Sequence, residues 1–271
     1  MSLSPDVRRR VLLLALVCAQ FVAMLDSSIL NVALPSMSQE LALTRTGSAW
    51  ILNAYFLTFG GFLLVAGRAA DLFGRRRMFL LGSSLLVGSS ALASLATNEA
   101  VVIAARMIQG LGAAALTPAA LSLLLLTFPG EQKARAMSAW GAASALGGAA
   151  GVSVGGVMVT AFGWQSVFII TGAVALANLV VAARLTPPDA VGSQRSFDVA
   201  GAVTVTGAAL AIVFGVLSAP ESGLVSLEVL GSAGVAVALV VVFIIVERRA
   251  VDPVVPLDLF RSATVSAGVA V

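Results

Sequence analysis

The chain has 271 residues, of which 59% are hydrophobic and 11% are charged, and its mean hydropathy is +1.03. A soluble domain carries about a quarter charged residues, so this composition indicates a membrane protein. Histidine is absent and Cys18 is the single cysteine, which argues against histidine-based catalysis, a disulfide framework and a metal site. The formal charge of +3 does not indicate nucleic-acid binding, because the basic residues lie in short loops between apolar runs.

Eight apolar stretches are long enough to cross a bilayer, since about 20 helical residues span roughly 30 Å of hydrocarbon. In chain order they cover residues 11–34, 48–67, 78–97, 101–127, 136–162, 165–183, 199–219 and 229–246. Two of them share one uncharged stretch, whose polar break at residues 163–165 is the expected turn. The chain is therefore predicted to be an all-α polytopic membrane protein.

The basic residues predict the orientation of these spans. Of the 16 lysines and arginines, all but Arg45 and Arg106 lie before the first span, in the loops after the second, fourth and sixth spans, or after the eighth span. Such residues concentrate on the cytoplasmic side, so the N-terminus is predicted to be cytoplasmic and the protein to be multi-pass in the cell membrane. The basic N-terminus also has the polarity of a signal peptide, but no small-residue cleavage site follows, so the first span is expected to stay uncleaved.

One carboxylate, Asp26, interrupts the first span. A charge at mid-depth costs about 2.5–3.5 kcal/mol on insertion scales, so it is expected to face protein or a water-filled cavity. Loss of hydration favours the protonated carboxyl, which makes Asp26 a candidate proton carrier. The alternative is a capping or helix-packing role. The sequence Leu-Asp-Ser-Ser-Ile-Leu-Asn-Val-Ala-Leu-Pro at residues 25–35 resembles the first-helix motif L-D-x-T-x-x-N-V-A-L-P of the 14-spanner drug:proton antiporters of the major facilitator superfamily.

A short charged turn joins the second and third spans, with the sequence Gly-Arg-Ala-Ala-Asp-Leu-Phe-Gly-Arg-Arg-Arg at residues 67–77. It is too short to recross the bilayer, so the two spans are antiparallel neighbours. The turn resembles the superfamily signature G-x-L-A-D-x-x-G-R-R, although Ala69 stands where leucine is usual. The resemblance implies a cytoplasmic gate loop, in which the glycines allow tight turning and the aspartate pairs with a helix N-terminus or an arginine in one conformation. Its residues are Gly67, Asp71, Gly74, Arg75 and Arg76. The alternative is that these charges only fix topology.

Arg106 is the second charge within a span. Residues 102–114 resemble the fourth-helix antiporter motif L-x-x-x-R-x-x-Q-G-x-G-A-A, which implies a role for Arg106 in proton coupling; an arginine that snorkels to the outer interface is the alternative. At 1.5 Å per residue, Asp26 and Arg106 both lie roughly 10 Å below the outer surface, so a pair is possible. Loss of hydration favours the protonated form of the Asp26 carboxyl, whereas an arginine partner favours the charged form, and the sequence does not decide between the two. The candidates for the substrate cavity are Asn31, Gln109 and Gly110.

The fifth span carries a glycine face. Gly147, Gly151 and Gly155 follow one another at a spacing of four residues, with Gly156 adjacent. Small residues on one face let another helix approach closely, so this face predicts tight packing whatever the function. The segment also resembles the exporter motif G-x-x-x-G-P-x-x-G-G, but Val152 occupies the proline position and weakens the inference of export.

The resemblance implies a major facilitator fold and a division of the chain into three parts. Residues 1–184 are expected to form an N-terminal six-helix bundle of two inverted three-helix repeats. Residues 185–246 would hold two linker helices, as in 14-spanners, because the loop after the eighth span lacks the repeated signature. Residues 247–271 would hold a cytoplasmic loop and the start of a ninth span, so the chain is expected to be part of a longer protein; an eight-span protein with a disordered tail is the alternative.

The expected function is proton-coupled export of amphipathic small molecules such as drugs or antibiotics. The implied partners are the substrate, protons and the bilayer, with no nucleic acid, no cofactor and no metal, and the complete protein is expected to be monomeric. The alternatives are a proton-coupled metabolite importer and a non-transporting membrane fragment. An enzyme is not expected, because the spans lack histidine, a paired carboxylate site and a nucleophile–base pair.

Overall fold

The computed structural model describes residues 4–186, 188–189 and 198–249, which form eight helices and no strand. All eight helices are long and apolar enough to cross a membrane, so the prediction of an all-helical polytopic protein is confirmed for these residues. The helices are α1 Pro5–Glu40, α2 Arg45–Phe73, α3 Arg75–Ser94, α4 Glu99–Thr127, α5 Glu131–Phe162, α6 Gln165–Leu185, α7 Val199–Ser222 and α8 Leu227–Glu247. Each predicted span coincides with one helix, and the turn predicted at residues 163–165 lies between α5 and α6.

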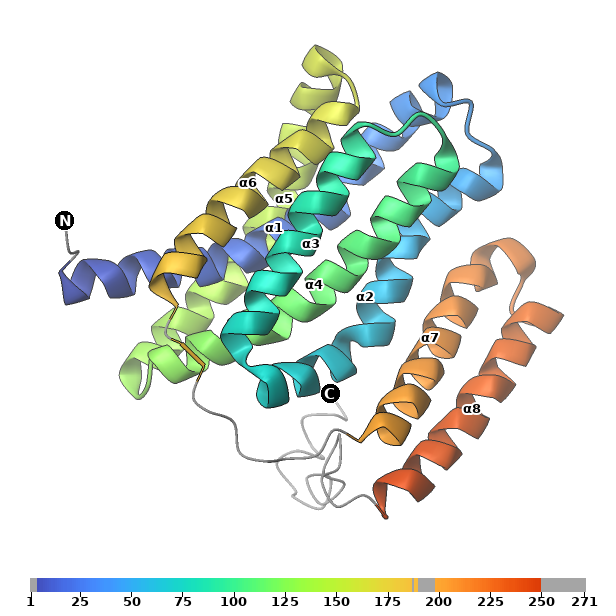
Figure 1. Cartoon of the computed structure of the whole chain (residues 1–271). Coiled ribbons are helices and arrows are strands. Elements are labelled where there is room, and N and C mark those ends of the chain that lie inside the picture. The colour runs from blue at the N-terminus through green and yellow to red at the C-terminus, as the bar shows by residue number, and fades with distance from the viewer. Residues whose placement is uncertain (1–3, 187, 190–197, 250–271) are drawn as a thin grey trace. The chain divides into compact units, whose positions relative to one another are not determined.

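The chain divides into two compact units, Met1–Val191 and Gly192–Val271. The first contains α1–α6 (Figure 1), and the second contains α7 packed against α8. Residues 250–271, where the start of a ninth span is expected, lie outside the described part of the chain.

The helix contacts of the first unit are symmetric when α1–α3 are exchanged with α4–α6. Helix α1 packs along α5 as α4 packs along α2, and α1 contacts α6 as α4 contacts α3. The pairs α3–α6 and α1–α4 map onto themselves. Because each repeat has three helices, α1 and α4 run in opposite directions, as an inverted repeat requires.

Polar contacts hold the ends of the helices that lie opposite the 67–77 turn. The hydroxyl of Thr44 accepts a hydrogen bond from the Gly47 N–H (2.8 Å) and caps α2. The Oε2 of Glu99 accepts from both the backbone N–H and the hydroxyl of Thr44 (3.1 Å each). The side chain of Asn98 caps α4 by accepting from the Val101 N–H (3.0 Å). The loop before α2 is therefore tied to the first turn of α4, its main packing partner.

Two apolar clusters fill the first unit, one toward each end of the bundle, and a layer of polar residues separates them. The cluster near the 67–77 turn includes Leu16, Phe79, Leu116 and Trp140. The other includes Ile29, Ile51, Val102, Trp164 and Phe168. Along α1 the first cluster ends at Val22 and the second begins at Ile29, which leaves Asp26 between them. Burial of this apolar surface on both sides fixes the depth at which the polar side chains meet.

Candidate proton-coupling site

Asp26 of α1 and Arg106 of α4 form an ion pair inside the first unit. The Nη1 of Arg106 lies 2.6 Å from the Oδ2 of Asp26, and the two side chains are 1% and 2% exposed, respectively. The two charges that the sequence places at similar depth are therefore in direct contact. Removal of one partner from such a buried pair costs about 3–5 kcal/mol, because the other charge is left without compensation.

Gln109 and Ser90 complete the polar layer around this pair. The Nη1 of Arg106 also donates to the Oε1 of Gln109 (2.8 Å), three residues further along the same face of α4. The amide Nε2 of Gln109 donates to the Oγ of Ser90 on α3 (3.0 Å) and to the Oδ1 of Asp26 (3.5 Å). Asp26, Arg106 and Gln109 thus form a hydrogen-bonded ring between α1 and α4, and Ser90 joins α3 to it.

Tyr55 of α2 covers the ring of polar groups. The Cζ of Arg106 lies 4.4 Å from the centroid of the tyrosine ring, a cation–π contact. The Tyr55 hydroxyl donates to the Ala23 carbonyl oxygen (3.4 Å), which ties α2 to α1. Sequence reasoning missed both Tyr55 and Ser90; the usable signal was that Tyr55 is the single tyrosine of the chain and lies in an uncharged span.

The chemistry open to this layer follows from its donors and acceptors. Among the described residues of the first unit, Asp26 is the buried carboxylate, and a carboxylate can exchange a proton where a guanidinium cannot. Arg106 holds Asp26 through one nitrogen, and its Nε has no hydrogen-bond partner in the described part of the chain. Protonation of Asp26 would remove the charge that holds this contact, while Arg106 would keep its bond to Gln109.

The glycine face of α5 packs directly on α1. A Cβ at Gly151 would lie 1.9 Å from the Oγ of Ser28 and 2.9 Å from the backbone nitrogen of Ile29. At Gly155 a Cβ would lie 2.7 Å from the Cγ1 of Ile29, and at Gly147 it would meet a backbone oxygen of α1 at 2.5 Å. These distances leave no room for a side chain, so the three glycines set the spacing of the two helices.

Gly156 was wrongly grouped with that face. A Cβ at Gly156 would meet no atom within 4 Å among the described residues. The reason is geometric: at 3.6 residues per turn, the residue after Gly155 points about 100° away from the contact.

The three candidates for the substrate cavity lie in different environments. Gln109 is fully buried in the polar layer. Gly110 lies in the α2–α4 contact, where a Cβ would come 2.0 Å from the Oγ1 of Thr58, so it packs helices and does not line a cavity. Asn31 is exposed on α1, and its Nδ2 donates to the carbonyl oxygen of Ser27 (3.3 Å).

The predicted gate loop is shorter than the sequence suggested. Helix α2 continues through Gly67 to Phe73, so the expected turn at Gly67 is wrong, and a Cβ added at Gly67 would make only an ordinary van der Waals contact with Pro118. The chain reverses at Gly74, whose φ of 106° favours glycine. Asp71 at the end of α2 pairs with Arg75 at the start of α3 (2.8 Å), and the two side chains are 48% and 36% exposed.

Arg76 and Asp189 bind the start of α3 to the end of α6. The guanidinium of Arg76 donates to the hydroxyl of Thr186 (3.1 Å) and to the carbonyl oxygen of Ala183 (2.7 Å). In return, the carboxylate of Asp189 accepts from the backbone N–H groups of Arg76 (2.8 Å) and Arg77 (3.1 Å), and so caps the first turn of α3. Sequence reasoning missed Asp189, because nothing in its neighbourhood along the chain points to a helix more than 100 residues earlier.

Comparison with known proteins agrees with this architecture. The family model for the Major Facilitator Superfamily matches residues 16–246. The chain is 39% identical over 243 residues to an uncharacterized MFS-type transporter, EfpA, of Mycobacterium tuberculosis, covering 89% of this chain and 46% of that protein. It is 37% identical over 257 residues to the tetracenomycin C resistance and export protein of Streptomyces glaucescens, covering 94% and 48%. The puromycin resistance protein of Streptomyces alboniger is 39% identical over 260 residues, covering 93% and 50%.

Solved transporter structures share the fold. A peptide transporter of the POT family in complex with sulfate aligns with a TM-score of 0.65 at 16% identity, over 89% of this chain and 53% of that one. The human organic anion transporter MFSD10 aligns with a TM-score of 0.59 at 14% identity, over 78% and 56%. The chain spans about half the length of the curated relatives it matches. It is a multi-pass membrane protein that belongs to the major facilitator superfamily, a family of transporters and not of enzymes.

Proposed function

We propose that the complete gene product containing this chain is a proton-coupled exporter of amphipathic small molecules, of the drug- or antibiotic-efflux type. The observation that carries the proposal is the buried Asp26–Arg106 pair, since both residues fall on positions that resemble antiporter motifs. Relatives whose names refer to tetracenomycin C resistance and export and to puromycin resistance support the same substrate class.

The polar layer suggests how protonation of Asp26 changes the contacts between the helices of the bundle. A proton that reaches Asp26 from the outside neutralises the carboxylate and removes the electrostatic hold on Arg106. The guanidinium is then held by Gln109 and by the ring of Tyr55 but no longer by Asp26, so it can shift within the layer. Because the layer joins α1, α2, α3 and α4, a change in this one pair alters contacts of all four helices. Release of the proton to the cytoplasm restores the pair.

The proposal includes the division and orientation of the chain. Residues 1–184 form the N-terminal bundle, residues 185–246 form two linker helices, and residues 247–271 lead toward a ninth span. The N-terminus and the 67–77 loop are cytoplasmic in the cell membrane, in keeping with the basic residues at that end of the bundle. The 67–77 loop acts as the cytoplasmic gate, and the complete protein works as a monomer. The other half of the substrate cavity comes from a second bundle, toward which the exposed Asn31 is a candidate contact.

The test is substrate-driven proton movement in everted membrane vesicles that contain the complete gene product. After respiration has acidified the vesicles, addition of puromycin or ethidium should release protons, seen as recovery of a quenched pH-sensitive dye. Asp26→Asn should abolish this recovery, because the amide cannot carry the proton. The matched control is Glu131→Gln, which removes one carboxylate from an exposed site in the first turn of α5.

Two outcomes would contradict the proposal. Dye recovery in Asp26→Asn at the wild-type level, with equal protein in the membrane, would exclude Asp26 as the proton carrier. Accumulation of the substrate in intact energised cells would show uptake and not export, in favour of a proton-coupled importer.

A further inference from the structure

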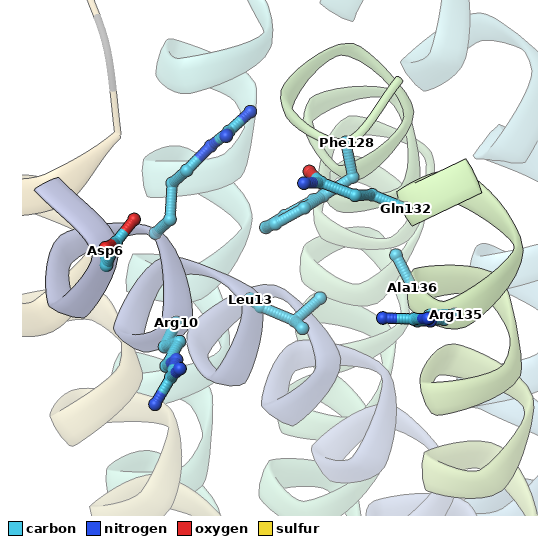
Figure 2. A pocket seen from close by; sticks show the side chains of 8 residues that line it. Asp6, Arg10, Leu13, Phe128, Gln132, Arg135 and Ala136 are labelled. Atoms are coloured by element: carbon cyan, nitrogen blue, oxygen red, sulfur yellow. The ribbon is translucent and has the colours of Figure 1, made fainter. Parts of the chain in front are cut away.

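A basic cavity of about 350 Å³ opens between the start of α1 and the start of α5, away from the polar layer. Three arginines line it, Arg9 and Arg10 from α1 and Arg135 from α5, together with the amide of Gln132. Leu13 contributes apolar surface between the side chains of Arg10 and Arg135 in the view of Figure 2. The volume lies in the range of small-ligand sites, about 300–1,000 Å³.

The cavity lies where the sequences of α1 and α5 change from charged to apolar, the pattern expected where a membrane passes from headgroups to hydrocarbon. On α1 the basic run ends at Arg10 and the apolar run begins at Val11. On α5 the corresponding boundary falls between Arg135 and Ala136, and both residues line the cavity. Helix α1 therefore places Arg10 and Leu13 around this space, and α5 places Arg135 and Ala136 there, which suits a ligand with a charged head and an apolar tail.

The arginine side chains of this cavity differ in the contacts that they form with the rest of the protein. Arg9 donates to the Thr127 carbonyl oxygen (3.0 Å) and lies over the ring of Phe128, 5.9 Å from its centroid, so it holds the end of α4. In the described part of the chain, the side chains of Arg10 and Arg135 form neither a hydrogen bond nor an ion pair. Asp6 also borders the cavity and offsets one charge, but it lies beyond ion-pair distance of the arginines, and the lining stays net positive.

We propose that this cavity binds the phosphodiester of an anionic phospholipid from the leaflet that contacts this end of the bundle. Arg10 and Arg135 bind the phosphate oxygens, for which the planar guanidinium is well matched, and the Gln132 amide adds a neutral donor. Leu13 and Phe128 contact the glycerol backbone and the first carbons of the acyl chains. Basic cavities between transmembrane helices at a membrane surface are a recognised setting for anionic headgroups. The site is independent of the proton-coupling layer and goes beyond the proposed export function.

The test measures lipid retention by the complete gene product purified in detergent, by native mass spectrometry after equilibration with equal amounts of phosphatidylglycerol and phosphatidylcholine. The test variant is the double substitution Arg10→Gln and Arg135→Gln. The matched control is Arg8→Gln and Lys133→Gln, which removes two positive charges from the same two helices at exposed positions outside the cavity. Each arginine is expected to form a charge-assisted hydrogen bond worth about 1.5 kcal/mol, so phosphatidylglycerol should bind the test variant on the order of a hundredfold more weakly. The control should retain it as the wild type does.

A second measurement locates the lipid and separates it from free anions. A photoactivatable phosphatidylglycerol should label peptides from residues 5–13 and 128–136, and the test variant should lose this labelling while its thermal unfolding in neutral detergent stays unchanged. Equal losses in test and control variants would show diffuse attraction to the surface and overturn the site. Binding of inorganic phosphate with no preference between the two lipids would also overturn it, since the ligand would then be a soluble anion.

Discussion

The contact between α5 and α1 can be tested by adding one methyl group at Gly151. A Cβ there would lie 1.9 Å from the Oγ of Ser28, 2.9 Å from the Ile29 nitrogen and 3.0 Å from the Leu25 carbonyl oxygen. Contacts below 3.0 Å force atoms apart, and two of these three partners are backbone atoms that cannot rotate away. Overpacking of this kind costs about 1–3 kcal/mol. Gly151→Ala should therefore destabilise the protein, although alanine favours a helix over glycine by up to about 1 kcal/mol.

The matched controls lie on the same helix. Gly148→Ala and Gly156→Ala add the same methyl group where no described atom lies within 4 Å, so both should be neutral or slightly stabilising. Thermal unfolding in detergent is the assay. For a protein of this size, about 1 kcal/mol corresponds to roughly 2–4 °C, so Gly151→Ala should lower Tm by roughly 3–10 °C relative to the controls. Adding Ser28→Ala to Gly151→Ala removes the hydroxyl and should restore only part of the lost Tm, because the contacts with the backbone atoms remain.

Equal unfolding temperatures for Gly151→Ala and Gly156→Ala would refute this reasoning. They would mean that α5 and α1 are not in backbone contact and that the glycine spacing is incidental. Gly151→Leu should be more damaging still, and it should impair transport by the complete gene product because α5 must move away from α1.

The other predictions concern the ion pair, the gate loop and the topology. Arg106→Lys should impair proton-coupled transport although it keeps the charge, because a point-like ammonium cannot replace a guanidinium that contacts Asp26, Gln109 and the ring of Tyr55 together; wild-type dye recovery would contradict this. Asp189→Ala should remove the cap of α3, worth about 1 kcal/mol, and speed amide exchange at Arg76 and Arg77 roughly fivefold, whereas unchanged exchange would show that the cap is not formed. In a Cys18→Ala background, Thr97→Cys should react with an impermeant thiol reagent added outside cells and Arg77→Cys should not; the reverse pattern would invert the proposed topology.

The sequence was sufficient for the spans because length and apolarity decide whether a helix crosses a membrane. It was less reliable at helix ends. Helix α2 extends past Gly67 to Phe73, since a single glycine inside a helix is tolerated and only the positive φ at Gly74 stops it. The prediction that Asp26 and Arg106 share one layer is confirmed by their contact, because the rise per residue is constant and two charges can be placed at one level from sequence alone.

The neighbours of the ion pair were not predictable in the same way. Tyr55 and Ser90 reach the pair from α2 and α3, and the rotation of those helices about their axes is set by packing across the bundle, not by local sequence. The position of Gly110 was not predictable for the same reason. It follows Gln109 in the motif, but one residue along a helix points to a different neighbour, so Gly110 faces Thr58 and packs helices.

The hydrogen bonds of the first unit suggest why a proton at Asp26 would move the bundle as a whole. At the end opposite the gate loop, Glu99 holds the start of α2 and Gln165 of α6 donates to Glu40 of α1 (3.0 Å). At the gate-loop end, Arg76 and Asp189 hold α3 to the end of α6. Both ends are tied by contacts outside the buried charge pair, so protonation of Asp26 leaves them in place. The layer between the two apolar clusters is the part whose contacts depend on the buried carboxylate of Asp26. Under the proposed function, a change in that layer would act on the bundle while the contacts at both ends keep its helices together, as rigid-body alternating access requires.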